Sequence, residues 1–288
     1  MMNDIPVRYV SSAGRAFVLQ GDGRAFLDVF PLFRFSWDYE LVNSTSGMGG
    51  AATNFARFPK TVELELRLRG YDRQGFLDKI NELHRVAEPD LVAATPGRLY
   101  LGDQYMVCYL TAAGGVSSAP RNGHFATQAL TVLAVRPFWC REVEFQFVPQ
   151  SGGSEVENDM AKKYNLRYPY RYNTGLNARQ LYNNFYLPTP MIITIQGPAS
   201  TPAIQIGSNV YRVNAQVLAT EYLVIDQPAR QIYTVGETGQ RVNRFNDRDK
   251  RTDIFAPAPV GNSTVLYNGG FVVSIRLVQQ RSAPEWTE

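Results

Sequence analysis

The first half of the chain contains short segments in which hydrophobic and polar residues alternate. The clearest is residues 61–69, where four apolar residues alternate with four charged ones: Val62, Glu63, Leu64, Glu65, Leu66, Arg67, Leu68 and Arg69. A period of two places successive side chains on opposite faces of a β-strand. We therefore expect a strand with one face in a core and the other in contact with water or a partner.

Other strands of the first half are predicted by similar patterns. They are residues 15–20, 24–33, 33–42, two strands within 97–114, and a long strand at 125–140. Proline has no amide hydrogen for a sheet ladder, so Pro137 is expected to stop the last of these. We place the domain boundary there, which gives domains of residues 1–140 and 141–288.

One helix is predicted in the first half, within residues 72–90, where Asp72 can cap its start. Apolar residues recur there at helical spacing, with Leu77 widening the stripe: Phe76, Ile80, Leu83 and Ala87. Pro89 is expected to end the helix. The stripe is of the kind that packs on a sheet.

The second half contains further short strand signals. They are residues 142–150, 190–196, 203–206, 210–218, 221–226, 231–236 and 271–278. Gly, Pro, Asn and Asp separate them at intervals of roughly ten residues, which is typical of a β-sandwich or jelly roll. The sequence thus predicts a mainly β protein with two domains and one packed helix.

Composition adds a few limits. The 288 residues include 29 basic and 26 acidic ones spread along the chain, a balance that does not favour nucleic-acid binding. No apolar run has the ~18–20 residues needed to cross a bilayer, and the N-terminus lacks a signal-peptide pattern. We expect no membrane association and folding in a cytoplasm. Cys108 and Cys140, each within an apolar strand-like run, are interpreted as buried thiols, with a disulfide the less favoured alternative.

The residues offer little catalytic chemistry. Two histidines, His84 and His124, leave few options for a triad or a metal site, and no HExxH, GxSxG or CxxC motif occurs. The acidic residues of 247–253 alternate with arginine and lysine, which favours a solvated loop over a cation site. We expect no enzyme activity, cofactor or metal.

Two interpretations of function remain, from different classes. Two polar, glycine-rich loops, residues 43–55 and 114–124, have little to bury and favour ordering against a neighbouring subunit. A β-sandwich in the second domain alternatively suggests binding of host cell-surface glycans. No clustered aromatic platform for a sugar is visible in the sequence.

Four stretches of the chain, taken in order, carry a resemblance to a known family. They are GRLYLGDQYMVCYL with LTVLAVRPFW, NTGLNARQLYNNFYLPTPMIITIQGPASTPAIQI, QIYTVGETGQRVN, and DIFAPAPVGNSTVLYNGG with VSIRLV. They resemble the distal tail protein (Dit) family of long-tailed phages. In that family a strand runs into Pro-Phe-Trp at the end of the first domain, and a paired-proline strand followed by Ile-x-Gly-Pro opens the second.

The resemblance implies both a fold and a role. The fold is an N-terminal tail-tube-like β-barrel or sandwich with one packed helix, followed by a C-terminal galectin-like β-sandwich. The role is a structural virion protein of the phage tail tip, assembled in the bacterial host cytoplasm. It would form a hexameric ring between the tail tube protein and the tail-associated hub and receptor-binding proteins, with phage DNA passing through without specific binding. The sugar-contacting pattern of true galectins is not visible, so sugar binding does not carry over.

A closed ring needs two different complementary patches on each subunit. We place one on the glycine-rich segment 43–57 with strand 61–69, and the other on the flank of helix 73–87. The candidate interface residues are Met48, Asn54, Phe55, Arg57, Glu63, Glu65, Arg67, Arg69, Arg73 and Lys79.

Overall fold

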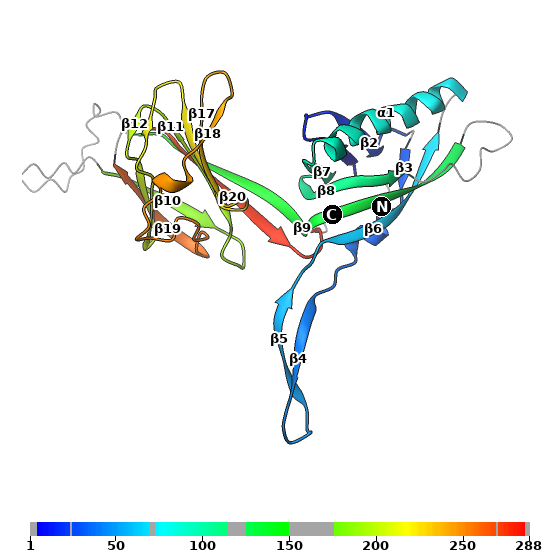
Figure 1. The fold of residues 1–288 in the computed structure, drawn as a ribbon, viewed down its shortest axis with the longest axis horizontal. Coiled ribbons are helices and arrows are strands. Elements are labelled where there is room, and N and C mark those ends of the chain that lie inside the picture. Colours follow the sequence, from blue (N-terminus) through cyan, green and yellow to red (C-terminus); the bar gives the residue numbers. More distant parts are fainter. Residues whose placement is uncertain are drawn as a thin grey trace, which may run out of the picture. The chain divides into compact units, whose positions relative to one another are not determined.

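The chain folds into two compact units. The computed structural model describes residues 5–23, 25–69, 73–113, 125–149, 176–268 and 270–285. The first unit takes in the described residues of Met1–Arg141 and Gln280–Glu288, and the second those of Glu142–Gln279. Strands dominate both (Figure 1), in agreement with the predicted mainly β fold class. The last residues group with the first unit, whereas the sequence-based division assigns them to the second.

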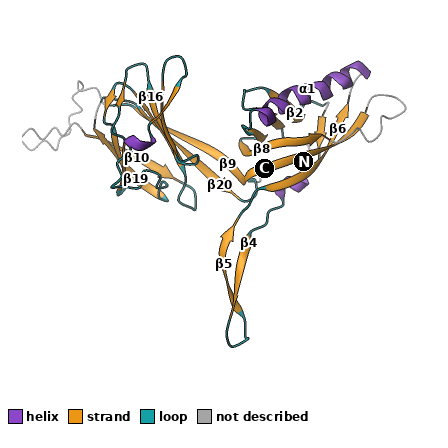
Figure 2. Cartoon of the chain, in the orientation of Figure 1, coloured by secondary structure: helices purple, strands orange, loops and turns teal. Residues whose placement is uncertain are grey.

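The first unit is an antiparallel sheet with a helix on it (Figure 2). Its strand order is β9-β8-β7-β1-β2, and β6 pairs with β3 and β9. The elements are β1 (Val7–Val10), β2 (Ala16–Gln20), β3 (Ala25–Leu27), β4 (Asp38–Asn43), β5 (Gly50–Ala56), β6 (Lys60–Arg69), α1 (Arg73–Val92), β7 (Gly97–Leu101), β8 (Gln104–Ala113) and β9 (Phe125–Phe147).

Strand β6 has the two faces that its alternation predicts. Leu64, Leu66 and Leu68 are at most 2% exposed and belong to the core of this unit. The intervening charged residues are exposed. The period of two in the sequence is therefore sufficient to assign each side chain of β6 to its face.

Helix α1 is longer than predicted, because it continues through Pro89 to Val92. The buried carboxylate of Asp90, one residue further on, accepts hydrogen bonds from the Tyr9 hydroxyl at 2.6 Å and from the Ser12 amide at 2.9 Å. These long-range bonds anchor the last turn although proline removes one helical donor. Burial, reinforced by the bond to Asp90, raises the pKa of the Tyr9 phenol.

The apolar face of α1 differs in detail from the predicted stripe. Leu83 and Ala87 are buried and Ile80 packs against the core, as predicted, and Val86 joins them. Leu77 is 41% exposed and does not widen the stripe. The side chain of Phe76 lies outside the described residues.

Two predicted strands of the first unit are also corrected. Within the predicted strand 24–33, the described residues form the short β3 and then a 3-10 helix, Phe30–Phe33, because Pro31 has a fixed φ that suits the first helical turn. Strand β9 does not stop at Pro137 but runs on to Phe147. Pro137 lies in a β-bulge, between the pairs Val107–Arg136 and Met106–Trp139, where no ladder donor is needed.

The glycine-rich segment 43–55 is more regular than predicted. Its second half forms β5, which pairs antiparallel with β4 in a separate two-stranded sheet. The predicted polar loop at 114–124 lies outside the described residues.

The second unit is built from two facing sheets, as the short, evenly spaced strands predict. One sheet has the order β18-β17-β16-β11-β20-β9 and the other β10-β19-β13-β14. The elements are β10 (Leu176–Asn183), β11 (Met191–Gln196), β12 (Ala199–Ser200), β13 (Ala203–Ile206), β14 (Asn209–Arg212), β15 (Gln216–Val217), β16 (Tyr222–Asp226), β17 (Gln231–Val235), β18 (Arg241–Asn243), β19 (Gly261–Asn268) and β20 (Val273–Arg281).

The proline-bounded strands at 190–196 and 203–206 are found as β11 and β13, and they belong to different sheets. Ile193 and Ile195 of β11 pack in one core with Ile204 and Ile206 of β13. The turn between them therefore carries the chain from one layer of the sandwich to the other.

The cysteines are buried, as the sequence analysis predicts. Cys108 and Cys140 are both buried, and burial raises the pKa of the Cys108 thiol to about 12. Across the described part of the chain, α1 and the shorter helical turns are not of the length and apolar character that a membrane-crossing helix needs.

Candidate assembly surface

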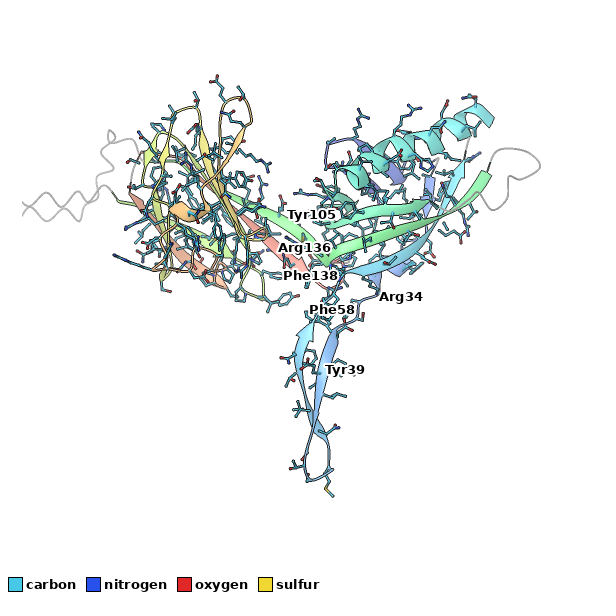
Figure 3. All side chains as sticks on the ribbon, in the orientation of Figure 1. Arg34, Tyr39, Phe58, Tyr105, Arg136 and Phe138 are labelled. Carbon is cyan, nitrogen blue, oxygen red and sulfur yellow. The ribbon has the colours of Figure 1, made fainter. Side chains whose placement is uncertain are left out.

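The β4–β5 hairpin exposes apolar side chains along its whole length. In Figure 3 the hairpin extends away from the sheet and helix of the first unit, with Tyr39 on one of its strands. Leu41 is 65% exposed and Met48, in the turn, is 88% exposed. A two-stranded sheet is marginally stable by itself in water. This hairpin therefore has both the exposed apolar surface and the physical need for a partner.

A bulge in the hairpin gathers three of these side chains on one face. Asn54 has a positive φ of 54°, and the register shifts so that Asn54 and Phe55 lie opposite the single residue Tyr39. The rings of Tyr39 and Phe55 are 5.9 Å apart, and Leu41, two residues from Tyr39, shares its face. The Asn54 amide donates to Glu40 on the paired strand at 2.5 Å. The result is a continuous stripe of Tyr39, Leu41 and Phe55, which we call the hairpin stripe.

Arg57 fixes the root of the hairpin. Its guanidinium lies over the Phe138 ring at 4.7 Å and the Trp37 ring at 5.7 Å, and donates to the Ser282 carbonyl at 3.3 Å. Its Nε is buried with no hydrogen-bond partner among the described residues, and burial lowers the guanidinium pKa. Arg57 was predicted as an interface residue, and in the single chain it is an internal support that holds the hairpin root against β9.

The outward face of β6 carries the four predicted charged residues: Glu63, Glu65, Arg67 and Arg69, all exposed. Glu65 and Arg67 form an ion pair at 2.9 Å. Exposed pairs of this kind contribute little to stability, so their partners can change without a large free-energy cost. The face is suited to contact with a charged neighbour.

The predicted patch on the helix flank is less available. Lys79 lies 3.0 Å from Glu82 and 3.6 Å from Asp22, over the ring of Phe17 at 5.3 Å. Its charge is thus already paired within the unit, where it ties α1 to the β2–β3 turn. The side chain of Arg73 lies outside the described residues.

The sequence analysis missed the apolar members of the hairpin stripe contributed by β4. Residues 33–42 were predicted as a strand, and Tyr39 and Leu41 were not assigned to an interface. One signal was available in the sequence. The alternating segment 33–42 is followed by a glycine-rich segment that offers few apolar side chains to pack against it.

The described residues hold no group of three or more His, Cys, Asp or Glu side chains that could bind a metal ion. The acidic segment 247–253 uses its carboxylates locally. Asp247 pairs with Arg244 at 3.6 Å, and Asp249 and Asp253 accept hydrogen bonds from backbone amides two residues later.

Comparison with known proteins gives a consistent result at the level of structure. No protein-family model matches the sequence, and no curated protein matches it at a significant level. The Dit protein of phage SPP1, described as a paradigm of the hub adsorption apparatus in phages that infect Gram-positive bacteria, superposes with a TM-score of 0.59 at 12% identity over 96% of this chain and 99% of its own.

Two structures of the phage p2 baseplate in its activated conformation give similar values. The Ca²⁺ form matches with a TM-score of 0.61 at 11% identity, and the Sr²⁺ form with 0.61 at 12%. Each match covers 97% of this chain and 99% of the compared chain. Since the similarity extends over nearly the full length of every chain compared, this protein has the fold of the Dit hub proteins, as its sequence resemblance implies.

Proposed function

We propose that this protein is a structural component of a phage tail tip that assembles into a hexameric ring. The ring joins the tail tube protein to the tail-associated hub and receptor-binding proteins and lets phage DNA pass. The protein has no catalytic task in this proposal. Its site of action is the virion, after assembly in the bacterial host cytoplasm.

The single observation that carries the proposal is the hairpin stripe. Monomeric proteins rarely expose contiguous apolar surface without using it for binding. Tyr39 and Leu41 are 55% and 65% exposed, and Phe55 is 60% exposed. Aromatic side chains of this kind are the residues that most often dominate binding energy at interfaces.

The shared fold supports the same role. The compared structures are a hub protein of an adsorption apparatus and chains of a phage baseplate. We infer that the first domain is the ring-forming, tail-tube-like one and that the second is galectin-like. The outer face of β6, with Glu63, Glu65, Arg67 and Arg69, supplies a second, charged contact surface of the first unit.

The test is the mass of the purified chain by size-exclusion chromatography with light scattering. We expect six times the chain mass for the native sequence and a monomer for the triple variant Tyr39→Ser, Leu41→Ser, Phe55→Ser. The monomeric variant should still unfold cooperatively, because none of these side chains is buried within the unit.

A matched control removes three exposed apolar side chains from the second unit: Leu218→Ser, Tyr222→Ser and Val242→Ser, which are 55%, 41% and 46% exposed. This variant should keep the ring. A native chain that stays monomeric at high concentration, or a hexamer that survives the hairpin substitutions, would refute the proposal.

A further inference from the structure

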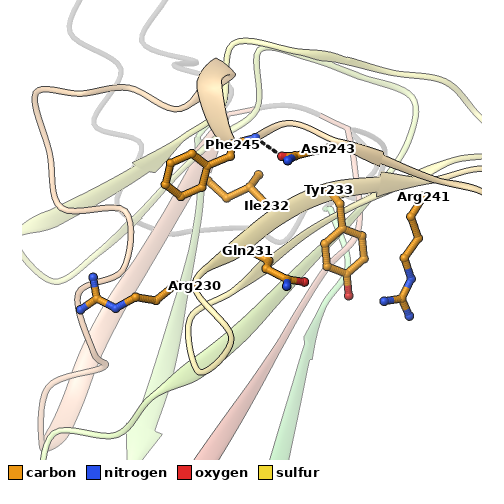
Figure 4. A pocket seen from close by; sticks show the side chains of 7 residues that line it. All are labelled: Arg230, Gln231, Ile232, Tyr233, Arg241, Asn243 and Phe245. Carbon is orange, nitrogen blue, oxygen red and sulfur yellow. Dashed lines mark hydrogen bonds between the residues drawn. The ribbon is translucent and has the colours of Figure 1, made fainter. Parts of the chain in front are cut away.

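A surface hollow of about 300 Å³ lies at one edge of the larger sheet of the second unit (Figure 4). Its volume is near the lower end of the range for small-molecule sites. It is lined by Arg230, Gln231, Ile232, Tyr233, Arg241, Asn243 and Phe245.

The strand register places four of these polar side chains on one face of the sheet, and in Figure 4 Arg230 and Arg241 lie on either side of Gln231 and Tyr233. Tyr233 of β17 lies directly opposite Asn243 of β18, the last strand of the sheet. Gln231 shares the face of Tyr233, and Arg241 shares the face of Asn243, because residues two apart on a strand point the same way. Arg230 precedes β17 in a turn, with a positive φ of 53° that few non-glycine residues adopt.

The two arginines of the hollow differ from their neighbours in charge balance. Within the described residues, Arg230 and Arg241 have no ion pair; their recorded contacts are with rings, Phe255 at 5.9 Å and Tyr233 at 4.9 Å. Arg244, close by in sequence, pairs with Asp247 instead. The hollow therefore holds two guanidinium groups that form no ion pair within the described residues. Asp226, opposite Gln231 on β16, accepts a hydrogen bond from the Ala229 amide at 2.9 Å and pairs with neither arginine.

The remaining lining is a mixture of neutral donors and aromatic surface. The side-chain Oδ1 of Asn243 accepts a hydrogen bond from the Phe245 backbone amide at 2.8 Å, which leaves the side-chain NH₂ as a donor. Gln231 is exposed and supplies a second amide. The partly exposed rings of Tyr233 and Phe245 supply aromatic surface (Figure 4), whereas Ile232 is buried in the core of the unit.

We propose that this hollow binds an anionic saccharide, a sugar unit that carries a carboxylate or a phosphate. Planar guanidinium groups bind such oxyanions in bidentate geometry, and amide donors suit sugar hydroxyls. A bare anion would leave the aromatic surface unused, and a neutral sugar would leave both guanidinium groups without an ionic partner. An acidic peptide added along β18 would gain few backbone bonds, since that strand has three residues.

The sequence analysis left open that the second domain binds glycans. The proposed site gives that interpretation a location and a preference for acidic sugars, and the proposal does not depend on ring assembly.

The test applies the full-length chain to an array of neutral, uronate-containing and phosphorylated oligosaccharides, followed by calorimetric titration of the bound sugars. We expect binding to acidic glycans only, weakened by added salt. Arg241→Gln and Arg230→Gln should each weaken binding about ten-fold or more, through loss of a charge-assisted bond.

The matched control is Arg212→Gln, which removes an exposed arginine from β14 in the other sheet and should leave affinity unchanged. The proposal fails if no acidic glycan binds, if neutral glycans bind equally well, or if Arg241→Gln has no effect. It also fails if inorganic phosphate competes as well as the sugar, or if an oligoglutamate peptide binds in its place. Light scattering on the same samples separates this outcome from the ring: a monomer that still binds acidic glycans contradicts only the proposed function.

Discussion

The hairpins β4–β5 and β16–β17 are both antiparallel and both rich in apolar residues, but their side chains have opposite exposure. Leu223 and Ile225 of β16 are at most 1% exposed, whereas Leu41 of β4 is 65% exposed. Strand β16 also pairs with β11, and its inward residues pack against the facing sheet. Strands β4 and β5 pair only with each other among the described residues. Local pattern alone thus does not decide burial, because burial needs a second layer of structure.

The largest effect that separates the two hairpins is on stability. Ile225→Ala should lower the free energy of unfolding by about 2–5 kcal/mol, because it leaves a cavity in the sandwich core. Leu41→Ala should change it by no more than about 0.5 kcal/mol in the monomer. Denaturant unfolding of both variants checks this, and equal losses would mean that the hairpin is buried within the single chain.

A second prediction concerns the response of Cys108, on the buried strand β8, to alkaline pH. The pKa of Cys108 is about 12 in the fold, against an ordinary value near 9.0. Between these values the unfolded chain loses the thiol proton and the folded chain keeps it, so stability falls as pH rises, by about 1.4 kcal/mol per pH unit. Below pH 9 both states hold the proton and this contribution is constant.

The measurement is the free energy of unfolding of the native chain and of Cys108→Ala between pH 8 and 12. The variant should lose stability less steeply, and the difference in slope isolates the thiol from the buried tyrosines. Parallel pH profiles would show that Cys108 is accessible to solvent.

The smallest expected effect tests the bulge at Asn54 within the β4–β5 hairpin. Asn54→Val should destabilise the β4–β5 pairing by about 1–2 kcal/mol, because a β-branched residue fits poorly at the positive φ of this bulge. Asn54→Gly, the matched control, accepts that conformation and should cost less than about 0.5 kcal/mol. Amide hydrogen exchange of residues 38–56 reports the difference. Equal protection in the two variants would show that the bulge does not set the register.

Some of the candidate surface follows from short-range pattern. The outward charges of β6 were predicted because a period of two fixes sides once a strand forms. Asn54 and Phe55 were predicted as interface residues, but their grouping with Tyr39 was not, since it depends on a one-residue bulge. Lys79 and Arg57 were predicted for an interface, and the fold gives each an internal partner that is distant in sequence.

The hollow of the second unit shows the same limit. Strand β17 was predicted at 231–236, but β18 was not predicted as a strand. The grouping of Arg230, Tyr233 and Arg241 around one hollow depends on the register of β17 against β18 and on the turn before β17. Sequence spacing does not reveal such a register because the pairing is set by neighbouring strands.

The sequence by itself determined the mainly β character, most strands, the single long helix and the face of each residue on β6. These features depend on periodicity and on proline and glycine chemistry, which act over a few residues. The tertiary structure alone decided that Pro89 and Pro137 do not end their elements, that segment 50–56 is a strand, and that the hairpin stripe is exposed. Each of these outcomes depends on contacts between residues far apart in the chain or, for the hairpin stripe, on the absence of such contacts within the described residues. Local propensity is too weak to override them.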